Sequence, residues 1–144
     1  MSDPLYRKEV LRLAADATGA GRLPHPCSTG RAFNPACGDR VTVDVALENG
    51  RITGLAHDTK ACVLTQASSA ILGSDLLGLR REEVAALRKH VVEMLKGGDA
   101  PPAPFDVFGV FDGVVLHGNR HICVLLPLDA VLSAFDASDA AKPG

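Results

Sequence analysis

The stretch VTVDVALENGRITGLAH (residues 41–57) decides the fold. Apolar residues alternate with polar or small ones over residues 41–47, which is the period of a strand with one buried face. Asn49-Gly50 follows, a pair that favours the two-residue turn of a β-hairpin. Residues 52–57 then return as the partner strand, with weaker alternation. The sequence therefore predicts an antiparallel hairpin near the start of the domain's core.

Helical patterns surround this hairpin. The apolar spacing predicts four helices, over residues 3–17, 62–72, 82–96 and 127–135. Three further segments are irregular: a loop or short edge strand over 22–36, a Pro-rich linker over 99–104, and the ambiguous 105–116. This order predicts an α+β fold, with a small antiparallel sheet of about three strands packed against several α-helices. We expect one domain over residues 1–135 and a disordered tail over residues 136–144.

Composition and charge exclude several classes of protein. The chain has 144 residues, the length of one domain, and carries 15 Lys+Arg against 17 Asp+Glu. No basic face is visible, so a nucleic-acid partner is not expected. No apolar run approaches the roughly 18 residues of a membrane span, and the N-terminus lacks the apolar core of a secretory signal. We therefore expect a cytoplasmic protein without a membrane partner.

The cysteines carry the chemical signal. Cytosolic thiols stay reduced, so cysteines in such a chain indicate metal or sulfur chemistry more than disulfides, although a buried Cys can be a small hydrophobe. Cys37 precedes the first good strand, and Asp39 follows two residues later. Cys62 stands at a predicted helix start, where the helix dipole favours a thiolate, and Cys123 precedes the last helix. Thiolates with a carboxylate suit zinc, and thiolates also suit iron–sulfur clusters.

A resemblance sharpens this prediction. The segment NPACGDR (residues 34–40), the hairpin after it, and Cys62 followed by QASS (residues 66–69) resemble the U-type iron–sulfur scaffold family of IscU, SufU and the NifU N-terminal domain. The resemblance covers nearly the whole chain. It implies a scaffold or sulfur carrier, not an enzyme, with a cysteine desulfurase and recipient apoproteins as partners. By the family's motif, the site that binds zinc or a 2Fe–2S cluster comprises Cys37, Asp39, Cys62 and Cys123.

The same resemblance implies that Cys62 and Cys123 are the candidate persulfide acceptors. It also favours the SufU-like branch, because the interval before Cys123 is long and Arg120 lies three residues before it. IscU-like members have a His immediately before the third cysteine, where this chain has Ile122. Whether His121 replaces that ligand is left open. Pro127 predicts that the last helix begins late, since proline breaks a helix interior.

Two other functions fit the same residues. A purely structural zinc domain needs only ligands on loops around a sheet. A hydrolytic zinc enzyme needs a general base near the metal, but the chain has no His-Glu-x-x-His motif and no Glu next to a Cys. The sequence leaves open the identity of the metal and whether the chain forms a homo-oligomer.

Several residues have ordinary interpretations. Cys27 reads as a loop thiol, and His57 and Asp58 read as a solvated strand end. Lys60 either lowers the pKa of Cys62 or is simply exposed. Three phenylalanines spaced by three are expected to pack under the Pro-rich linker, with a docking surface as the alternative: Phe105, Phe108 and Phe111.

Overall fold

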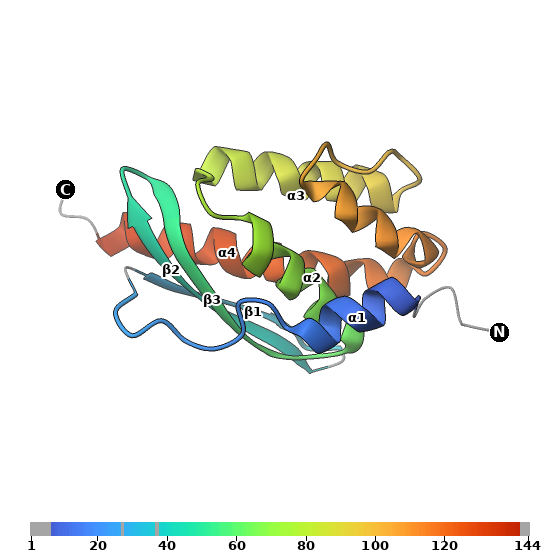
Figure 1. Ribbon diagram of the computed structural model, residues 1–144, viewed down its shortest axis with the longest axis horizontal. Helices are drawn as coiled ribbons and strands as arrows, with labels where there is room; N and C mark the ends of the chain where they lie inside the picture. Colours follow the sequence, from blue (N-terminus) through green and yellow to red (C-terminus); the bar gives the residue numbers. More distant parts are fainter. Residues whose placement is uncertain (1–6, 27, 37, 142–144) are drawn as a thin grey trace.

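The protein has three strands and four α-helices within the residues that the computed structural model describes, 7–26, 28–36 and 38–141, with side chains described as far as 138. The elements are α1 (Lys8–Asp16), β1 (Ser28–Asn34), β2 (Asp39–Glu48), β3 (Arg51–Lys60), α2 (Val63–Asp75), α3 (Arg81–Leu95), the 3₁₀ segments η2 (Phe105–Val114) and η3 (Gly118–Arg120), and α4 (His121–Ala141). Figure 1 shows this arrangement, which confirms the predicted α+β fold. Cys27 and Cys37 lie outside the described residues, as does the expected start of the first helix.

The predicted hairpin forms the larger part of the sheet. The strand order is β1-β2-β3, and both neighbouring pairs are antiparallel. Asn49 and Gly50 have positive φ angles of 54° and 78°. A two-residue turn that matches the strand twist requires such angles, and Asn and Gly tolerate them best. The sequence left residues 22–36 open as a loop or a short edge strand. The end of this segment forms the edge strand β1, which pairs with β2.

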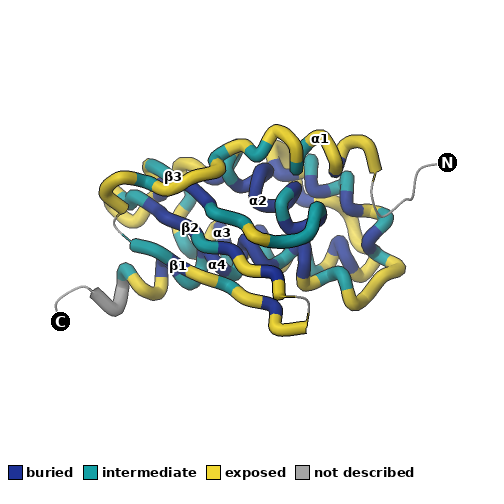
Figure 2. Tube along the Cα trace, turned by 90° about the horizontal axis from the view of Figure 1, so that it is seen from below, coloured by how far each residue is buried: buried dark blue, intermediate teal, exposed yellow. Residues whose placement is uncertain are grey.

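Helices cover one face of the sheet. α4 packs against β1 and β2, α2 packs against β3 and α4, and α3 packs against α4. The inward side chains of β2 are almost fully buried in this layer, namely Val41, Val43 and Val45. Figure 2, which looks from below, shows exposed and half-buried residues along the three strands. The core therefore lies between the sheet and the α2–α4 layer, and the opposite face of the sheet is largely open.

β1 and α4 touch backbone to backbone at Gly30. A Cβ at this position would lie 2.2 Å from the carbonyl oxygen of Ala130 and 2.2 Å from the nitrogen of Ala134. No larger residue fits there without separating the strand from the helix. Beside this contact, the Ser28 hydroxyl donates a hydrogen bond to the Ala134 carbonyl at 2.6 Å. The edge strand is thus attached directly to α4.

Asp44 is buried although it belongs to the outer row of β2. Its carboxylate accepts two hydrogen bonds from the Arg22 guanidinium, at 2.6 and 3.0 Å. The Leu23 N–H and the Thr29 hydroxyl also donate to it, at 3.1 and 2.6 Å. The hydrogen bond from Arg22 holds the pKa of Asp44 below its ordinary value, against the opposing effect of burial. This network attaches the segment between α1 and β1 to the sheet.

The same segment covers His57, which is not the solvated strand end expected from the sequence. Its side chain is only 4% exposed, and burial lowers the pKa of His57. Its Nε2 lies 2.9 Å from the Thr18 carbonyl, and its Nδ1 lies 2.9 Å from the Thr59 hydroxyl. The partner Thr18 is far away in the chain, so strand alternation could not reveal this burial. Asp58, beside it, is half-buried.

α4 departs furthest from the sequence prediction. The expected helix over 127–135 instead runs from His121 to Ala141, so residues 136–141, expected to be disordered, are helical. Pro127 lies inside it and has no N–H to donate to the carbonyl of Cys123, a defect that costs about 3 kcal/mol. Burial of one large apolar side chain gives about 1.5–3 kcal/mol. Four such residues flank the proline and outweigh the defect: Val124, Leu126, Leu128 and Val131.

By length and composition alone, the segment Gly118–Ser138 could cross a membrane, since its mean hydropathy is 1.4. The search for apolar runs in the sequence did not reveal it. Half of the segment is buried inside the protein, where α4 packs against β1, β2, α2 and α3. A long apolar helix is what the centre of this fold requires.

The ambiguous residues 105–116 form the 3₁₀ segment η2 over Phe105–Val114. In a 3₁₀ helix the side chains at i and i+3 lie above one another, which matches the spacing of Phe105 and Phe108, while the backbone kinks at Phe111, with φ −88° and ψ 15°. All three are buried, and the rings of Phe108 and Phe111 lie 6.0 Å apart between centroids. The prediction that they pack inward is confirmed, and they are not exposed for docking.

Candidate metal and sulfur site

The site is built where β2 begins, where α2 begins and where α4 begins. Asp39 is the first residue of β2, and its side chain is 6% exposed and turned toward the helices. Its Oδ1 accepts a hydrogen bond from the Cys62 N–H at 3.2 Å, and its Oδ2 accepts one from the Thr65 hydroxyl at 3.3 Å. Cys62 is the residue just before α2 and Thr65 lies in its first turn, so the carboxylate lies at that helix's N-terminus.

Cys62 is the N-cap residue of α2 and is half-buried. Its Sγ lies 3.5 Å from the Thr65 hydroxyl, which is therefore within reach of both the thiol and the Asp39 carboxylate. A hydrogen bond from Cys123 is the main cause that lowers the pKa of Cys62 to about 6, helped by Thr65 and opposed by burial and by Asp39. In the metal-free protein Cys62 is thus mainly thiolate at neutral pH, the form that binds metals and attacks sulfur.

Cys123 lies in the first turn of α4 and is 2% exposed. The sequence had placed it before the helix; the early start of α4 turns it inward beside α2. Ser68 of α2 holds this turn, because its hydroxyl donates to the carbonyl of Val124 at 2.7 Å. The two cysteines therefore belong to helices that are hydrogen-bonded to each other next to the site.

One ligand atom from each of Asp39, Cys62 and Cys123 lies within 4.8 Å of the other two. Two sulfur ligands of one tetrahedral zinc ion are about 3.8 Å apart, given a Zn–S distance near 2.3 Å. A small inward movement of side chains would bring all three onto one ion. Two sulfurs and one carboxylate oxygen suit zinc and iron–sulfur centres, so the donor set fits the predicted cargo.

Comparison with known proteins gives the family. Residues 5–114 match the family described as NifU-like N terminal domain. The chain belongs to this family. This chain is similar to the crystal structure of a nitrogen-fixing NifU-like protein (N-terminal) from Brucella abortus. The similarity covers 97% of this chain and 98% of the Brucella chain, with a TM-score of 0.90 and 32% identity.

Two proteins named iron–sulfur cluster assembly scaffold protein IscU are also similar to this family member. The protein from Streptococcus pyogenes serotype M1 is 31% identical over 110 residues, 76% of this chain and 69% of the relative. The protein from Thermotoga maritima is 26% identical over 93 residues, 65% of this chain and 66% of the relative. The alignments therefore span about two thirds of these relatives.

A structure described as an iron–sulfur cluster assembly scaffold protein for the SUF system, from Fervidobacterium islandicum AW-1, shares the fold. Its TM-score is 0.81 at 20% identity, over 94% of this chain and 99% of that chain. The family predicted from residues 34–40 and 66–69 is confirmed, and a SufU protein stands among its structural neighbours.

The structure brings together three of the four predicted site residues: Asp39, Cys62 and Cys123. Cys37, the fourth, lies outside the described residues. The His121 ring is directed elsewhere, with its Nε2 3.2 Å from the carbonyls of Val114 and Val115. Lys60 is exposed and is not among the groups that shift the pKa of Cys62.

Sequence reasoning missed Thr65. Its side chain is fully buried, and its hydroxyl lies between Asp39 and Cys62. A signal was available, because a residue three positions after a helix N-cap faces that cap across the first turn. The hydroxyl can donate one hydrogen bond, either to the carboxylate or to the thiolate, so it orients both groups.

Proposed function

We propose that this protein is an iron–sulfur cluster assembly scaffold that accepts sulfur and holds iron, zinc or a nascent 2Fe–2S cluster. The supporting observation is the meeting of Asp39, Cys62 and Cys123 within 4.8 Å, although they come from distant parts of the chain. The relatives named IscU are called assembly scaffolds, and this chain shares their family. We also propose a cysteine desulfurase as sulfur donor and apoproteins as recipients.

The ligand set we propose is Cys37, Asp39, Cys62 and Cys123. Cys37 precedes Asp39 by two residues in the β1–β2 connection, so one short segment would supply two ligands. Three thiolates and one carboxylate complete a tetrahedral site for one zinc ion, or four ligands for a two-iron cluster. The cluster is cargo in this proposal, built on these residues and then released.

Cys62 is the better placed of the two candidate persulfide acceptors, because it is half-buried whereas Cys123 is 2% exposed. The Cys62 thiolate would attack the outer sulfur of a donor cysteine persulfide. A new S–S bond forms on Cys62, the donor's S–S bond breaks, and the donor cysteine leaves as a thiolate. Cys123 then lies within hydrogen-bonding reach of the Cys62 sulfur and can help to hold it.

Asp39 would be the ligand that lets cargo leave. A carboxylate binds iron–sulfur centres less tightly than a thiolate does. Its two hydrogen bonds, to the Cys62 N–H and the Thr65 hydroxyl, keep it in position when no ion is held. Holding the ligand ready while binding weakly is what a transient carrier needs.

The experiment is metal and acid-labile sulfide analysis of protein purified without oxygen. The parent chain is compared with Cys62→Ser and with Cys27→Ser as matched control, since Cys27 has no place in the proposed ligand set. About one zinc or one cluster per chain is expected in the parent and the control, and loss of it in Cys62→Ser.

A second incubation, with a cysteine desulfurase, cysteine and ferrous iron, distinguishes an assembly scaffold from a structural zinc domain. Labile sulfide on the parent supports the scaffold. Zinc that stays bound, with no sulfide and no persulfide on Cys62, would assign the protein a structural zinc site instead. Metal-free protein in all three forms would overturn the shared site.

A further inference from the structure

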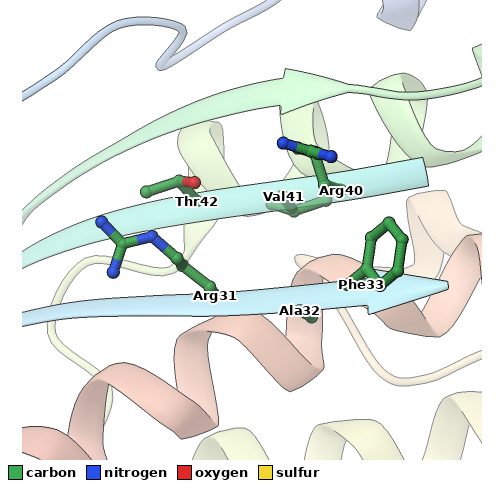
Figure 3. A pocket seen from close by; sticks show the side chains of 6 residues that line it. All are labelled: Arg31, Ala32, Phe33, Arg40, Val41 and Thr42. Carbon is green, nitrogen blue, oxygen red and sulfur yellow. The ribbon is translucent and has the colours of Figure 1, made fainter. Parts of the chain in front are cut away.

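Three cations and one aromatic ring gather on the open face of the sheet. Phe33 on β1 pairs with Arg40 on β2, and Arg40 pairs with Lys60 on β3, so the three side chains share one face. Arg31 lies two residues before Phe33 and therefore projects on the same side. Figure 3 shows Arg31, Phe33 and Arg40 standing on this surface. We call these four residues the basic sheet patch.

The patch is shaped like a binding surface. Phe33 is 53% exposed, an unusual state for so large an apolar side chain. The Arg40 guanidinium carbon lies 5.6 Å from the centroid of the Phe33 ring, which holds both side chains in place. Together with Arg31 and Thr42 they border a hollow of about 280 Å³. This is room for one or two side chains of a partner.

The charges of the patch are not neutralised within the described part of the chain. Five other arginines form ion pairs there: Arg7, Arg22, Arg51, Arg81 and Arg88. Arg31, Arg40 and Lys60 are exposed and form none among the described residues. Three uncompensated cations on a chain of net charge −2 make this surface complementary to an acidic one.

The patch also lies back to back with the metal and sulfur site. Asp39 and Arg40 are consecutive in β2, so the carboxylate turns to the helices and the guanidinium turns to the open face. Lys60 ends β3 two residues before Cys62. A protein seated on the patch therefore reaches the edge of the sheet at which Cys62 is accessible.

We propose that the basic sheet patch docks an acidic segment of the sulfur-donor protein, with carboxylates on Arg31 and Arg40 and an apolar side chain against Phe33. This rests on the proposed function, because it takes the donor to be the partner that must reach Cys62. A second copy of this chain is a poor occupant, since the two patches would repel each other. A nucleic acid is a poor one too, because the chain has a net negative charge and acidic Asp58 borders the same face on β3.

The test measures the dissociation constant of the full chain with a cysteine desulfurase by calorimetry at low ionic strength. All chains carry Cys62→Ser, so that docking is read without sulfur transfer. Arg31→Glu and Arg40→Glu are each expected to weaken binding about tenfold, and Phe33→Ala less. Lys89→Glu is the matched control, because Lys89 is an exposed cation on α3 and carries the same change of charge. It should bind like the parent, and circular dichroism verifies that every variant folds.

Equal binding of Arg31→Glu, Arg40→Glu and Lys89→Glu would overturn the proposal, as would no binding of the desulfurase to the parent. The proposal would also be overturned if the parent self-associates and Arg40→Glu abolishes this self-association. Binding to phosphatidylserine vesicles that depends on the patch would overturn it as well, because the surface would then have another occupant. Sulfur acceptance is measured separately on chains with Cys62 intact. If the parent accepts sulfur but the patch variants bind the desulfurase as tightly as the parent does, only the docking proposal is wrong. If the patch variants bind more weakly but the parent accepts no sulfur, only the acceptor role of Cys62 is wrong.

Discussion

Two buried carboxylates on the same strand have opposite surroundings. Asp44 accepts four hydrogen bonds, two of them from the guanidinium of Arg22. Asp39, five residues earlier, accepts two longer ones from neutral donors, and no Lys, Arg or His among the described residues forms an ion pair with it. The charge of Asp44 is neutralised inside the fold, whereas the charge of Asp39 is retained for a cation from outside. Burial alone does not distinguish a structural carboxylate from a metal ligand. The hydrogen-bond and ion-pair partners of the carboxylate make the distinction.

The largest expected effect is on stability, from Asp44→Ala. The variant should lose about 3 kcal/mol of unfolding free energy, because the donors around the carboxylate lose their acceptor. Its metal content should equal that of the parent. Urea unfolding and metal analysis measure both quantities. Asp58→Ala, which removes a half-buried carboxylate from the neighbouring strand, serves as control and should cost less than about 1 kcal/mol. Equal losses in the two variants would contradict the special role of Asp44.

The pH dependence of stability should follow Asp44 as well. Its pKa is lowered in the folded state, so the stability from its ionisation is fully present above its unfolded pKa, near pH 4. That stability is lost as the pH falls through the folded pKa. The parent should therefore exceed Asp44→Asn by about 2 kcal/mol at pH 7, and this difference should shrink as the pH falls below the unfolded pKa and through the lowered folded pKa. Parallel urea-midpoint curves over this range would show that Arg22 does not set the titration.

Asp39→Ala should do the opposite of Asp44→Ala. The metal-free chain should lose only about 1 kcal/mol of unfolding free energy, because two long hydrogen bonds from neutral donors are lost but no ion pair is. A reconstituted cluster should persist longer, because the labile carboxylate through which we propose that the cargo leaves has been removed. The decay of the cluster's visible absorption in the presence of a recipient apoprotein measures this lifetime. A shortened lifetime, or a loss of stability as large as that of Asp44→Ala, would end the distinction between the two carboxylates.

The smallest effect is expected at Thr65, which contacts Asp39 and Cys62 together. Thr65→Val keeps the shape but removes the hydroxyl, so the pKa of Cys62 should rise from about 6 toward its ordinary value. Alkylation of Cys62 in metal-free protein at pH 6.5 should slow about two- to threefold, as followed by peptide mass spectrometry. Thr65→Ser should restore the parent rate. An equal slowing in both variants would indicate a packing effect rather than a hydrogen bond.

The comparison of the carboxylates also shows what sequence could reveal. The hairpin over 41–57 was predictable, because alternation and the Asn49-Gly50 turn are local. Asp44 looked like an ordinary outward polar residue, since Arg22 is distant in the chain. The site residues other than Asp39 and Cys37 are too far apart for spacing to join them. Only the resemblance of residues 34–40 and 66–69 to a known family predicted that they form one site.

The predicted start of α4 was wrong for a related reason. Pro127 is a strong local signal against a helix, and local rules place the helix start after it. The burial of apolar residues on both sides of the proline depends on the sheet and on α2, which no window of sequence contains. The position of Cys123 inside the first turn of α4 was lost with that error. Boundaries set by tertiary packing are the part of the fold that periodicity cannot supply.

The contact at Gly30 bears on how the site accommodates cargo of different size. Because the backbones of β1 and α4 meet there without an intervening side chain, α4 cannot slide along its axis without separating from the sheet. Cys123 therefore forms a stationary wall of the site. We expect the difference in width between a single zinc ion and a two-iron cluster to be taken up opposite it, by the Asp39 side chain at the start of β2. The protein would adjust its grip on the cargo at the start of β2 while its longest helix stays still.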